Sequence, residues 1–412
     1  MLQPPSLLPL FPQEHILPNK RTLYFFPNNA LQLVKLDITL EAGSRYQHLK
    51  SLSHIANRLF GEATAQRSSR EVAEFLDFRG IVLERNTDVC VANLSFYFLR
   101  RYAEELFPLI REMFDAPLVE QPLFEANVAS RRLQLATGFQ KTSYVARNHF
   151  YELLYGPEHP LGTYALPDDV DTLTPEAVAD FIACHYRLGN ARLVLSGNID
   201  DALLTLADQY LSPVKEVPVA EPVLPAPHSN NQALKQSSIP NAVQSTIRIG
   251  RILPLPWDST DYARFLVLNT VLGGYFGSRL MSNLREDKGY TYGIYSMTQI
   301  YRGSIVFFLT ADVAAEATQS AVDEIFQEIK RLQQQPVPDE ELDRVRNFMM
   351  GDLIRSIDGV FDISERYRHI AATHVTEQLT ANLLDAILHV TPAQLQTLAQ
   401  TYLTDLVTVT VG

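Results

Sequence analysis

The spacing of apolar residues divides the first half of the chain into short strands and longer helices. Short runs rich in β-branched and aromatic side chains predict strands, whereas apolar residues that recur every three to four positions predict helices. The predicted strands are 22–26, 31–40, 81–85 and 90–99, the last two joined by a turn at 86–88. The predicted helices are 49–59, 69–79, 103–114 and 124–153.

The second half of the chain repeats this order of strands and helices. The predicted elements are a strand at 246–251, helices at 262–272 and 278–287, a strand pair at 290–299 and 304–311, and helices from 315 to 398. Antiparallel strands with helices gathered on one face form an α+β sandwich. The chain is therefore predicted to contain such a sandwich twice.

The ends of the two halves also match. Thr174 and the proline after it open one helix, and Thr391 with its proline opens another, about half the chain length further on. Threonine suits the N-cap and proline suits the first helical turn. A β-rich run follows each helix, at 191–198 and at 406–411. We therefore predict the α+β class with two homologous domains, each an antiparallel or mixed β-sheet with helices packed mainly on one face.

A proline-rich stretch near the middle of the chain marks the predicted domain boundary. Five prolines alternate with valine, glutamate and alanine between Pro213 and Pro227, and a polar run continues to Gln232. This composition is typical of an extended, semi-rigid linker. The predicted parts are an N-terminal domain over 1–212, a linker over 213–232 and a C-terminal domain over 233–412.

Composition and charge exclude several classes of protein. The chain has 35 basic and 47 acidic residues and a formal net charge of −12, which argues against a nucleic-acid binder because phosphate neutralisation needs a basic surface. Hydrophobic residues make up 46%, too many for a mainly disordered chain. Two cysteines, Cys90 and Cys184, cannot form a disulfide framework. With no apolar run long enough to span a membrane and no signal-peptide pattern at the start, we expect a cytoplasmic location.

One predicted helix carries the candidate chemistry. Its apolar residues share one face, which we expect to pack on the core: Leu52, Ile55, Ala56, Leu59 and Phe60. His54, Asn57 and Arg58 fall together on the opposite face. Taken alone, such a trio is most simply a solvated polar face.

Four further segments, in order along the chain, give that helix a context. They are 41–46, 62–68, 155–162 and 195–200. Together with the helix they resemble the insulinase/pitrilysin-type zinc peptidases over nearly the whole chain. The resemblance is greatest to the short-chain branch that includes the mitochondrial processing peptidase subunits. It implies an inverted zinc motif, His-x-x-Glu-His, in which two histidines bind zinc and the glutamate is the general base.

This sequence departs from that motif at the positions that carry the chemistry. By the resemblance, His54 stands at the first zinc ligand, Asn57 at the general base and Arg58 at the second ligand. The third ligand, a glutamate in the family, falls near Gln134. An amide cannot accept a proton from water, and a guanidinium has no lone pair for a metal and repels it. We therefore expect no metal and no catalytic residue in this chain, and zinc in a partner chain instead.

The second half keeps more of the family pattern. The resemblance implies that Arg285 and Tyr292 hold the substrate backbone near the zinc of the other half, because a guanidinium and a phenol can donate hydrogen bonds to a peptide carbonyl. The alternative is a helix-end arginine paired with an acid, and a half-buried tyrosine. Gly289 is expected to end the helix in the left-handed conformation. Tyr290, Tyr292 and Ile294 are expected to share one face of the next strand.

Two neighbouring features have plain structural explanations. Gly273, Gly274 and Gly277 lack the Lys-Ser/Thr pair that closes a P-loop, so we expect a glycine-eased helix start and no phosphate cradle. Arg279 is expected to be structural.

A degenerate zinc helix and an intact Arg285/Tyr292 pair together predict a non-catalytic, substrate-positioning subunit of a heterodimeric zinc peptidase. A partner with a complete His-x-x-Glu-His site would supply zinc, base and water, and the two chains would enclose and cleave a peptide. The alternative is a catalytically silent structural or peptide-binding homologue that forms a homodimer. A self-sufficient metallopeptidase with rearranged ligands is disfavoured, because a catalytic zinc needs three protein ligands.

Overall fold

The computed structural model describes residues 11–212, 221–227, 234–373 and 378–412, which form two compact units. Unit 1 comprises the chain up to Leu135 together with Ala165–Val223 and Ser356–Ala372. Unit 2 comprises Ala136–Tyr164, Leu224–Arg355 and the chain from Thr373 to the C-terminus. The predicted domains 1–212 and 233–412 differ from these units in two segments. Ala136–Tyr164 belongs to unit 2, and Ser356–Ala372 belongs to unit 1. The predicted linker 213–232 lies mostly outside the described residues.

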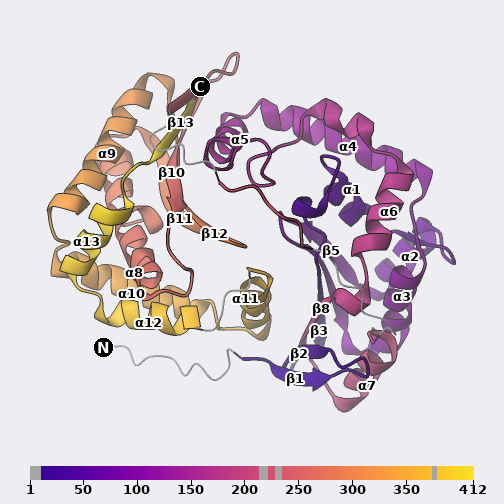
Figure 1. The fold of residues 1–412 in the computed structure, drawn as a ribbon. Coiled ribbons are helices and arrows are strands. Elements are labelled where there is room, and N and C mark those ends of the chain that lie inside the picture. Colours follow the sequence, from indigo (N-terminus) through magenta and orange to yellow (C-terminus); the bar gives the residue numbers. More distant parts are fainter. Residues whose placement is uncertain (1–10, 213–220, 228–233, 374–377) are drawn as a thin grey trace. The chain divides into compact units, whose positions relative to one another are not determined.

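Unit 1 is built on a six-stranded sheet in the order β1-β2-β8-β3-β6-β5 (Figure 1). The strands are β1 (Gln13–Ile16), β2 (Thr22–Pro27), β3 (Leu33–Leu40), β5 (Val82–Thr87), β6 (Ala92–Leu99) and β8 (Arg192–Gly197). The β2–β8 pair is parallel and every other pair is antiparallel. A short β4 (Ala63–Thr64) pairs with β7 (Pro117–Leu118) in a separate two-stranded sheet.

Unit 2 is built on a five-stranded sheet in the order β11-β12-β10-β13-β9. The strands are β9 (Leu234–Ser237), β10 (Gln244–Leu253), β11 (Thr291–Tyr301), β12 (Ser304–Ala314) and β13 (Val407–Val411). The β13–β9 pair is parallel and the others are antiparallel. Counted from β2 and from β9, the two sheets have the same order and the same strand directions. The predicted α+β class with two homologous domains is therefore confirmed.

Most helices of each unit belong to the layer that the sequence predicts. In unit 1 they are α1 (Leu52–Leu59), α2 (Ser69–Arg79), α3 (Ala103–Asp115), α4 (Gln121–Phe139), α6 (Pro175–His185) and α7 (Asp201–Tyr210). In unit 2 they are α8 (Thr260–Asn269), α9 (Thr318–Gln334), α10 (Asp339–Arg355), α12 (Gln378–His389) and α13 (Pro392–Tyr402). Thr174 and Thr391 cap α6 and α13 as predicted, accepting bonds from Ala177 N at 3.1 Å and Gln394 N at 3.3 Å. No helix in the described ranges is long and apolar enough to cross a membrane.

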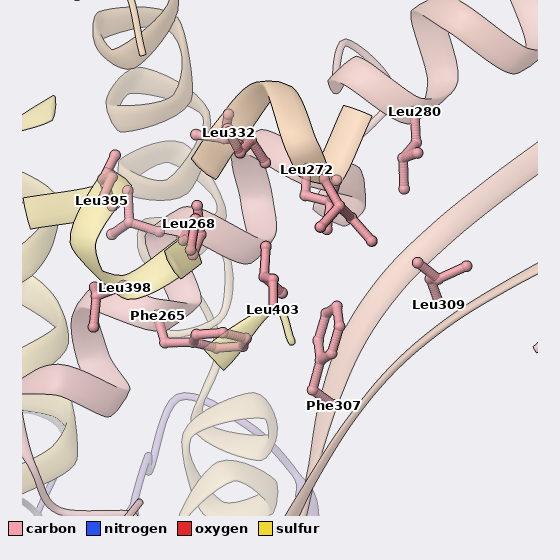
Figure 2. Packing of buried hydrophobic residues seen from close by; sticks show 14 of the residues in the cluster. Phe265, Leu268, Leu272, Leu280, Phe307, Leu309, Leu332, Leu395, Leu398 and Leu403 are labelled. Carbon is pink, nitrogen blue, oxygen red and sulfur yellow. The ribbon is translucent and has the colours of Figure 1, made fainter. Parts of the chain in front are cut away.

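The main core of unit 2 lies between its sheet and this helix layer. Figure 2 shows Phe307 and Leu309 of β12 facing Phe265 and Leu268 of α8. Leu332 of α9 and leucines of α13 complete the cluster. The rings of Phe265 and Phe307 meet edge to face with their centroids 5.4 Å apart. Such a dry, interlocked layer fixes where the strands β11 and β12 lie.

One helix covers the other face of each sheet, and it comes from the other half of the sequence. In unit 2 this helix is α5 (Thr142–Tyr155), whose Phe150 packs with Val306 and Phe308 of β12. In unit 1 it is α11 (Val360–Thr373), whose Ile363 packs on the sheet. Both sheets are therefore buried on two faces, which explains why β3 has almost no exposed position.

The exchange corrects one predicted helix. The apolar pattern over 124–153 predicts a single helix, but α4 ends at Phe139 and α5 begins at Thr142, after Lys141 in an extended conformation. Unit 1 ends at Leu135 within α4, and α5 lies wholly in unit 2, where it packs on the sheet.

Candidate functional site

Helix α1 packs its predicted apolar face into the core of unit 1. Leu52, Ile55, Ala56 and Leu59 are all at most 1% exposed, as is Phe60 directly after the helix. The helix begins after Ser51, which has a left-handed backbone with φ 68°. The face opposite the core therefore presents the residues at the zinc-motif positions.

The polar face of α1 is not the solvated surface that a polar trio suggests. Arg58 is exposed and His54 is half-buried, but Asn57 is only 1% exposed. The Tyr186 side chain, which is 2% exposed, lies beside Asn57. Burial raises the pKa of Tyr186, and a hydrogen bond with the Asn57 side chain opposes the rise, so these two buried groups are partners. Burial of Asn57 corrects the predicted exposed face, because residues at the edge of a helix stripe can be covered by a neighbouring segment.

The surroundings of His54 disfavour its charged form. Burial, and then the positive charges of Arg131 and Arg58, lower the pKa of His54 to about 4. Arg131 belongs to α4, and its Nε donates a hydrogen bond to Ser51 Oγ at 3.2 Å, next to the start of α1. Sequence reasoning did not single out Arg131, although it lies one helical turn before Gln134.

These residues do not fit a zinc ion. Gln134 is exposed on α4, and a neutral imidazole stands between two guanidinium groups where three ligands would be needed. Within the described ranges, no three His, Cys, Asp or Glu side chains come together in a way that could hold a metal. The positive charge of these arginine side chains repels a cation, so these residues disfavour metal binding.

The pKa of His54 supplies a direct test of this geometry. We expect Arg58→Gln to raise the pKa of His54 above about 4, because a nearby positive charge no longer opposes the imidazolium. The measurement is an NMR titration of the His54 ring carbon signals between pH 3 and pH 8. Arg70→Gln, on the exposed face of α2, is the matched control and should leave the His54 titration unchanged. An unchanged His54 pKa in Arg58→Gln would place Arg58 too far from His54 for the described geometry.

The lowered pKa of His54 also predicts how acid affects the fold. In the unfolded chain the imidazole takes up a proton near pH 6.5, whereas in the folded chain it does so near pH 4. The unfolded state therefore binds more protons between these values, and His54 destabilises the fold as pH falls through that window. We expect His54→Gln to reduce the loss of unfolding free energy between pH 6.5 and pH 4, measured by urea unfolding.

Arg285 and Tyr292 belong to unit 2, at the two ends of a short connection. Arg285 lies in the π-helical turn Met281–Asp287, and its guanidinium carbon is 4.5 Å from the centroid of the Phe276 ring. Gly289 ends this segment with φ 66°, which confirms the predicted left-handed stop. No hydrogen bond joins the side chains of these two described residues. Neither side chain is paired with an acid in the described ranges, and Arg285 packs against the Phe276 ring instead.

Tyr292 is held away from the core by a β-bulge. The register of β11 against β12 shifts between Thr291 and Ile294, so Tyr292 is 89% exposed while Ile294 is fully buried. The prediction that Tyr290, Tyr292 and Ile294 share one face is therefore wrong. The Thr291 hydroxyl fixes the bulge, because it donates to the Asp312 carbonyl at 2.6 Å and accepts from Gly293 N at 3.1 Å.

A pocket of about 810 Å³ lies beside the Tyr292 ring in unit 2. Its lining comprises residues 140–143, 241–244 and 289–292, together with Asp312 and Ala314. Cavities of this size commonly accept side chains or small ligands. An exposed phenol at the edge of such a pocket can donate a hydrogen bond to a bound chain.

Arg279 plays the structural part that the sequence predicts, whereas Gly273 and Gly274 end the helical segment Thr270–Gly274 and do not start a helix. Arg279 forms a bidentate pair with Glu341, with Nε–Oε1 at 2.9 Å and Nη2–Oε2 at 2.8 Å, which confirms its structural role. Gly273 lies against β11, where an added Cβ would come within 2.7 Å of Ser296 Oγ. The glycine run thus permits close packing of helix on strand.

Comparison with known proteins finds a matching family model and several distant relatives. Residues 172–349 match the family model described as the peptidase M16 inactive domain. An uncharacterized zinc protease of Rickettsia felis is 23% identical, with 85% of this chain and 84% of that protein aligned. The mitochondrial-processing peptidase subunit beta of Saccharomyces cerevisiae is 22% identical over 85% of this chain and 79% of its own. A relative in Helicobacter pylori, 22% identical over 73% of this chain and 69% of its own, is named non-peptidase homolog YmxG.

Solved structures show the same fold. The structure of a peptidase M16 inactive domain from Pseudomonas fluorescens superposes with a TM-score of 0.86 at 19% identity, covering 97% of this chain and 98% of that one. The family match of residues 172–349, the mitochondrial-processing peptidase relative and this shared fold together confirm the predicted resemblance.

Proposed function

Residues 172–349 of this chain are a peptidase M16 inactive domain, and from that premise we propose that the chain is the non-catalytic, substrate-positioning subunit of a heterodimeric zinc peptidase. The partner carries an intact His-x-x-Glu-His site with its zinc, general base and water. The substrate is a peptide, which the two chains enclose. The name non-peptidase homolog, given to the Helicobacter pylori relative, and the mitochondrial-processing peptidase likeness both support this division of labour.

The observation that carries the proposal is a contrast between the two units. In unit 1, Asn57 and Arg58 replace a base and a ligand, and the residues around them reject a metal. In unit 2, a bulge presents the Tyr292 hydroxyl to solvent, and Arg285 has no acid partner within the described ranges. Loss of the first site and retention of the second are consistent with a chain that orients substrate for chemistry done elsewhere.

The chemical role of the pair follows from its donors. A guanidinium and a phenol can each donate a hydrogen bond to a peptide carbonyl, which fixes the scissile bond and withdraws electron density from it. Such orientation contributes to catalysis only when a nucleophile is present, so this chain alone should be inactive.

The test is co-expression with a candidate catalytic partner encoded by a neighbouring gene. We expect the purified pair to cleave a quenched fluorescent peptide, and Arg285→Ala in this chain to lower kcat/KM of the pair about 10–100-fold, the effect of losing one positioning contact. Arg264→Ala, which removes a half-exposed arginine that pairs with the nearby Asp261, is the control and should leave kcat/KM unchanged. A partner that cleaves peptides equally well without this chain would refute the proposal.

The Tyr292 hydroxyl can be tested separately from the ring. We expect Tyr292→Phe to lower kcat/KM of the pair about tenfold, because one hydrogen bond to a carbonyl developing charge is lost. Tyr295→Phe is the matched control, since Tyr295 is also exposed and lies on the same strand. Equal effects of the two substitutions would show that the Tyr292 hydroxyl does not contact substrate.

A second candidate is a catalytically silent homodimer that binds peptides or serves as a structural subunit. The name of the Helicobacter pylori relative fits this candidate as well as the first, because that name assigns no peptidase activity. Light scattering of the purified chain decides between the two. A stable homodimer that recruits no peptidase partner on co-expression would favour the second candidate.

A further inference from the structure

The π-helical turn that carries Arg285 is held by two acids of α9. The Asn283 Nδ2 atom donates to Glu328 Oε1 at 2.6 Å and to Glu324 Oε2 at 3.0 Å. The Lys288 ammonium lies 3.5 Å from Glu324 Oε1. Because Asn283 precedes Arg285 by two residues and Lys288 follows it by three, α9 holds the chain on both sides of Arg285.

Glu328 differs from the other buried residues of α9 because it is charged. It is 3% exposed and also accepts a hydrogen bond from Arg331 Nη1 at 2.5 Å, although the Arg331 side chain is half-exposed. The other buried residues of the helix are apolar: Ala321, Ile325, Ile329 and Leu332. Burying a carboxylate costs free energy that an apolar side chain of similar size would not cost. Packing alone therefore does not explain an acid at this position.

The backbone of the turn is an uncommon form. The Lys288 N–H donates to the carbonyl of Asn283, five residues back, at 3.0 Å. Turns of this kind are rare and often occur at functional sites. Arg285 has no acid partner in the described ranges, so its backbone and its contact with the Phe276 ring determine where its guanidinium lies.

We infer that Glu328, acting through Asn283, is a positioning residue for Arg285. The buried carboxylate fixes the Asn283 amide, the amide fixes the π-helical turn, and the turn fixes the Arg285 guanidinium. This role has a consequence under the proposed function, on which the inference rests, because Arg285 there holds a peptide carbonyl for the partner's nucleophile. A displacement of about 1 Å in such a group can slow a reaction about 100-fold.

The experiment uses the full chain with its co-expressed catalytic partner. Glu328→Leu removes the acceptor and fills its space with an apolar side chain. We expect kcat of the pair to fall about tenfold while KM changes less than about twofold, because positioning acts on the reacting carbonyl. The melting temperature of the chain should stay close to that of the wild type, because the apolar side chain offsets the lost hydrogen bond. Asn283→Ala breaks the same hydrogen bond from the other side and should lower kcat in the same way.

Three further variants separate positioning from packing. Glu328→Gln keeps an acceptor for Asn283 and should keep most of the wild-type kcat. Glu328→Leu in an Arg285→Ala background should lower kcat no further, because a residue that acts through Arg285 then has nothing left to position. Gln327→Leu, at the neighbouring exposed position of α9, is the matched control and should leave kcat unchanged.

Failure of the positioning role differs measurably from failure of the proposed function. If Arg285→Ala lowers kcat but Glu328→Leu and Asn283→Ala do not, Glu328 does not position Arg285. The same conclusion follows if the effects of Glu328→Leu and Arg285→Ala multiply in the double variant. If Arg285→Ala itself has no effect on the pair, the proposed function fails, and the positioning role of Glu328 fails with it.

Discussion

Replacing Lys35 by methionine is expected to lower the free energy of unfolding by about 3–5 kcal/mol, the cost of leaving a buried charge without its partner. Lys35 is 2% exposed and Asp37 is fully buried, both on β3 beneath α11. The Lys35 ammonium lies 3.0 Å from Asp37 Oδ2 and 2.8 Å from Glu365 Oε2 of α11. Without the ammonium, the Asp37 carboxylate loses its counter-charge and α11 loses a contact with the sheet.

The pKa values of this cluster agree with that expectation. Burial raises the pKa of Asp37, while Lys35 and the Ser95 hydroxyl oppose the rise. Burial lowers the pKa of Lys35, but Asp37 and Glu365 outweigh it, so the net shift is upward. In Lys35→Met the carboxyl group of Asp37 is therefore expected to take up a proton in the folded state.

Urea unfolding at pH 7 measures the loss, and two further variants identify its cause. Lys35→Met/Asp37→Leu should recover much of the stability, because the uncompensated carboxylate is gone. Lys330→Met, an exposed lysine of α9, should change the free energy of unfolding by less than about 0.5 kcal/mol. A loss below about 1 kcal/mol in Lys35→Met would mean that the pair contributes little beyond packing.

Phe307→Ala is expected to destabilise the protein by about 3–5 kcal/mol, through lost transfer free energy and the cavity left behind. Phe307 is fully buried between β12 and α8, in the layer that Figure 2 shows. Its edge-to-face contact with Phe265 is lost as well. Because β12 pairs with β11 at the bulge that holds Tyr292, the same change should also make the position of the Tyr292 side chain less well defined.

Thermal unfolding followed by circular dichroism measures this effect. Phe78→Ala is the matched control, since the Phe78 ring on α2 is 86% exposed. This substitution should change the free energy of unfolding by less than about 0.5 kcal/mol. Phe307→Leu should lie between the two, because it keeps part of the buried volume. Equal melting temperatures for Phe307→Ala and Phe78→Ala would contradict the described core.

Local chemistry explains which parts of the fold could be predicted from the sequence. The caps at Thr174 and Thr391 and the left-handed Gly289 depend on a few consecutive residues, and all three were found where expected. The apolar pattern predicts a single helix over 124–153, because such a pattern indicates that one helix face is buried but does not identify the segment that buries it. Its division between α4 and α5 depends on long-range packing.

The same distinction holds for the candidate site. Spacing placed His54 and Arg58 on one face of α1, since helical geometry is local. The burial of Asn57 depends on Tyr186, and the position of Arg131 depends on α4, both distant in sequence. The exposure of Tyr292 depends on the register with β12, which no pattern within β11 reveals.

The exchange of α5 and α11 links the order of synthesis to the order of assembly. A ribosome delivers every strand of unit 1 by residue 197, yet the helix that covers Lys35 and Asp37 follows only with Val360–Thr373. Until α11 has been synthesised, it cannot cover this face of the nascent sheet. The charged Lys35 and Asp37 side chains are then accessible to solvent or to a chaperone. A chain cut within 213–232 would likewise yield two fragments that each hold a helix belonging to the other. Such fragments are expected to complement one another when mixed and to aggregate when kept apart.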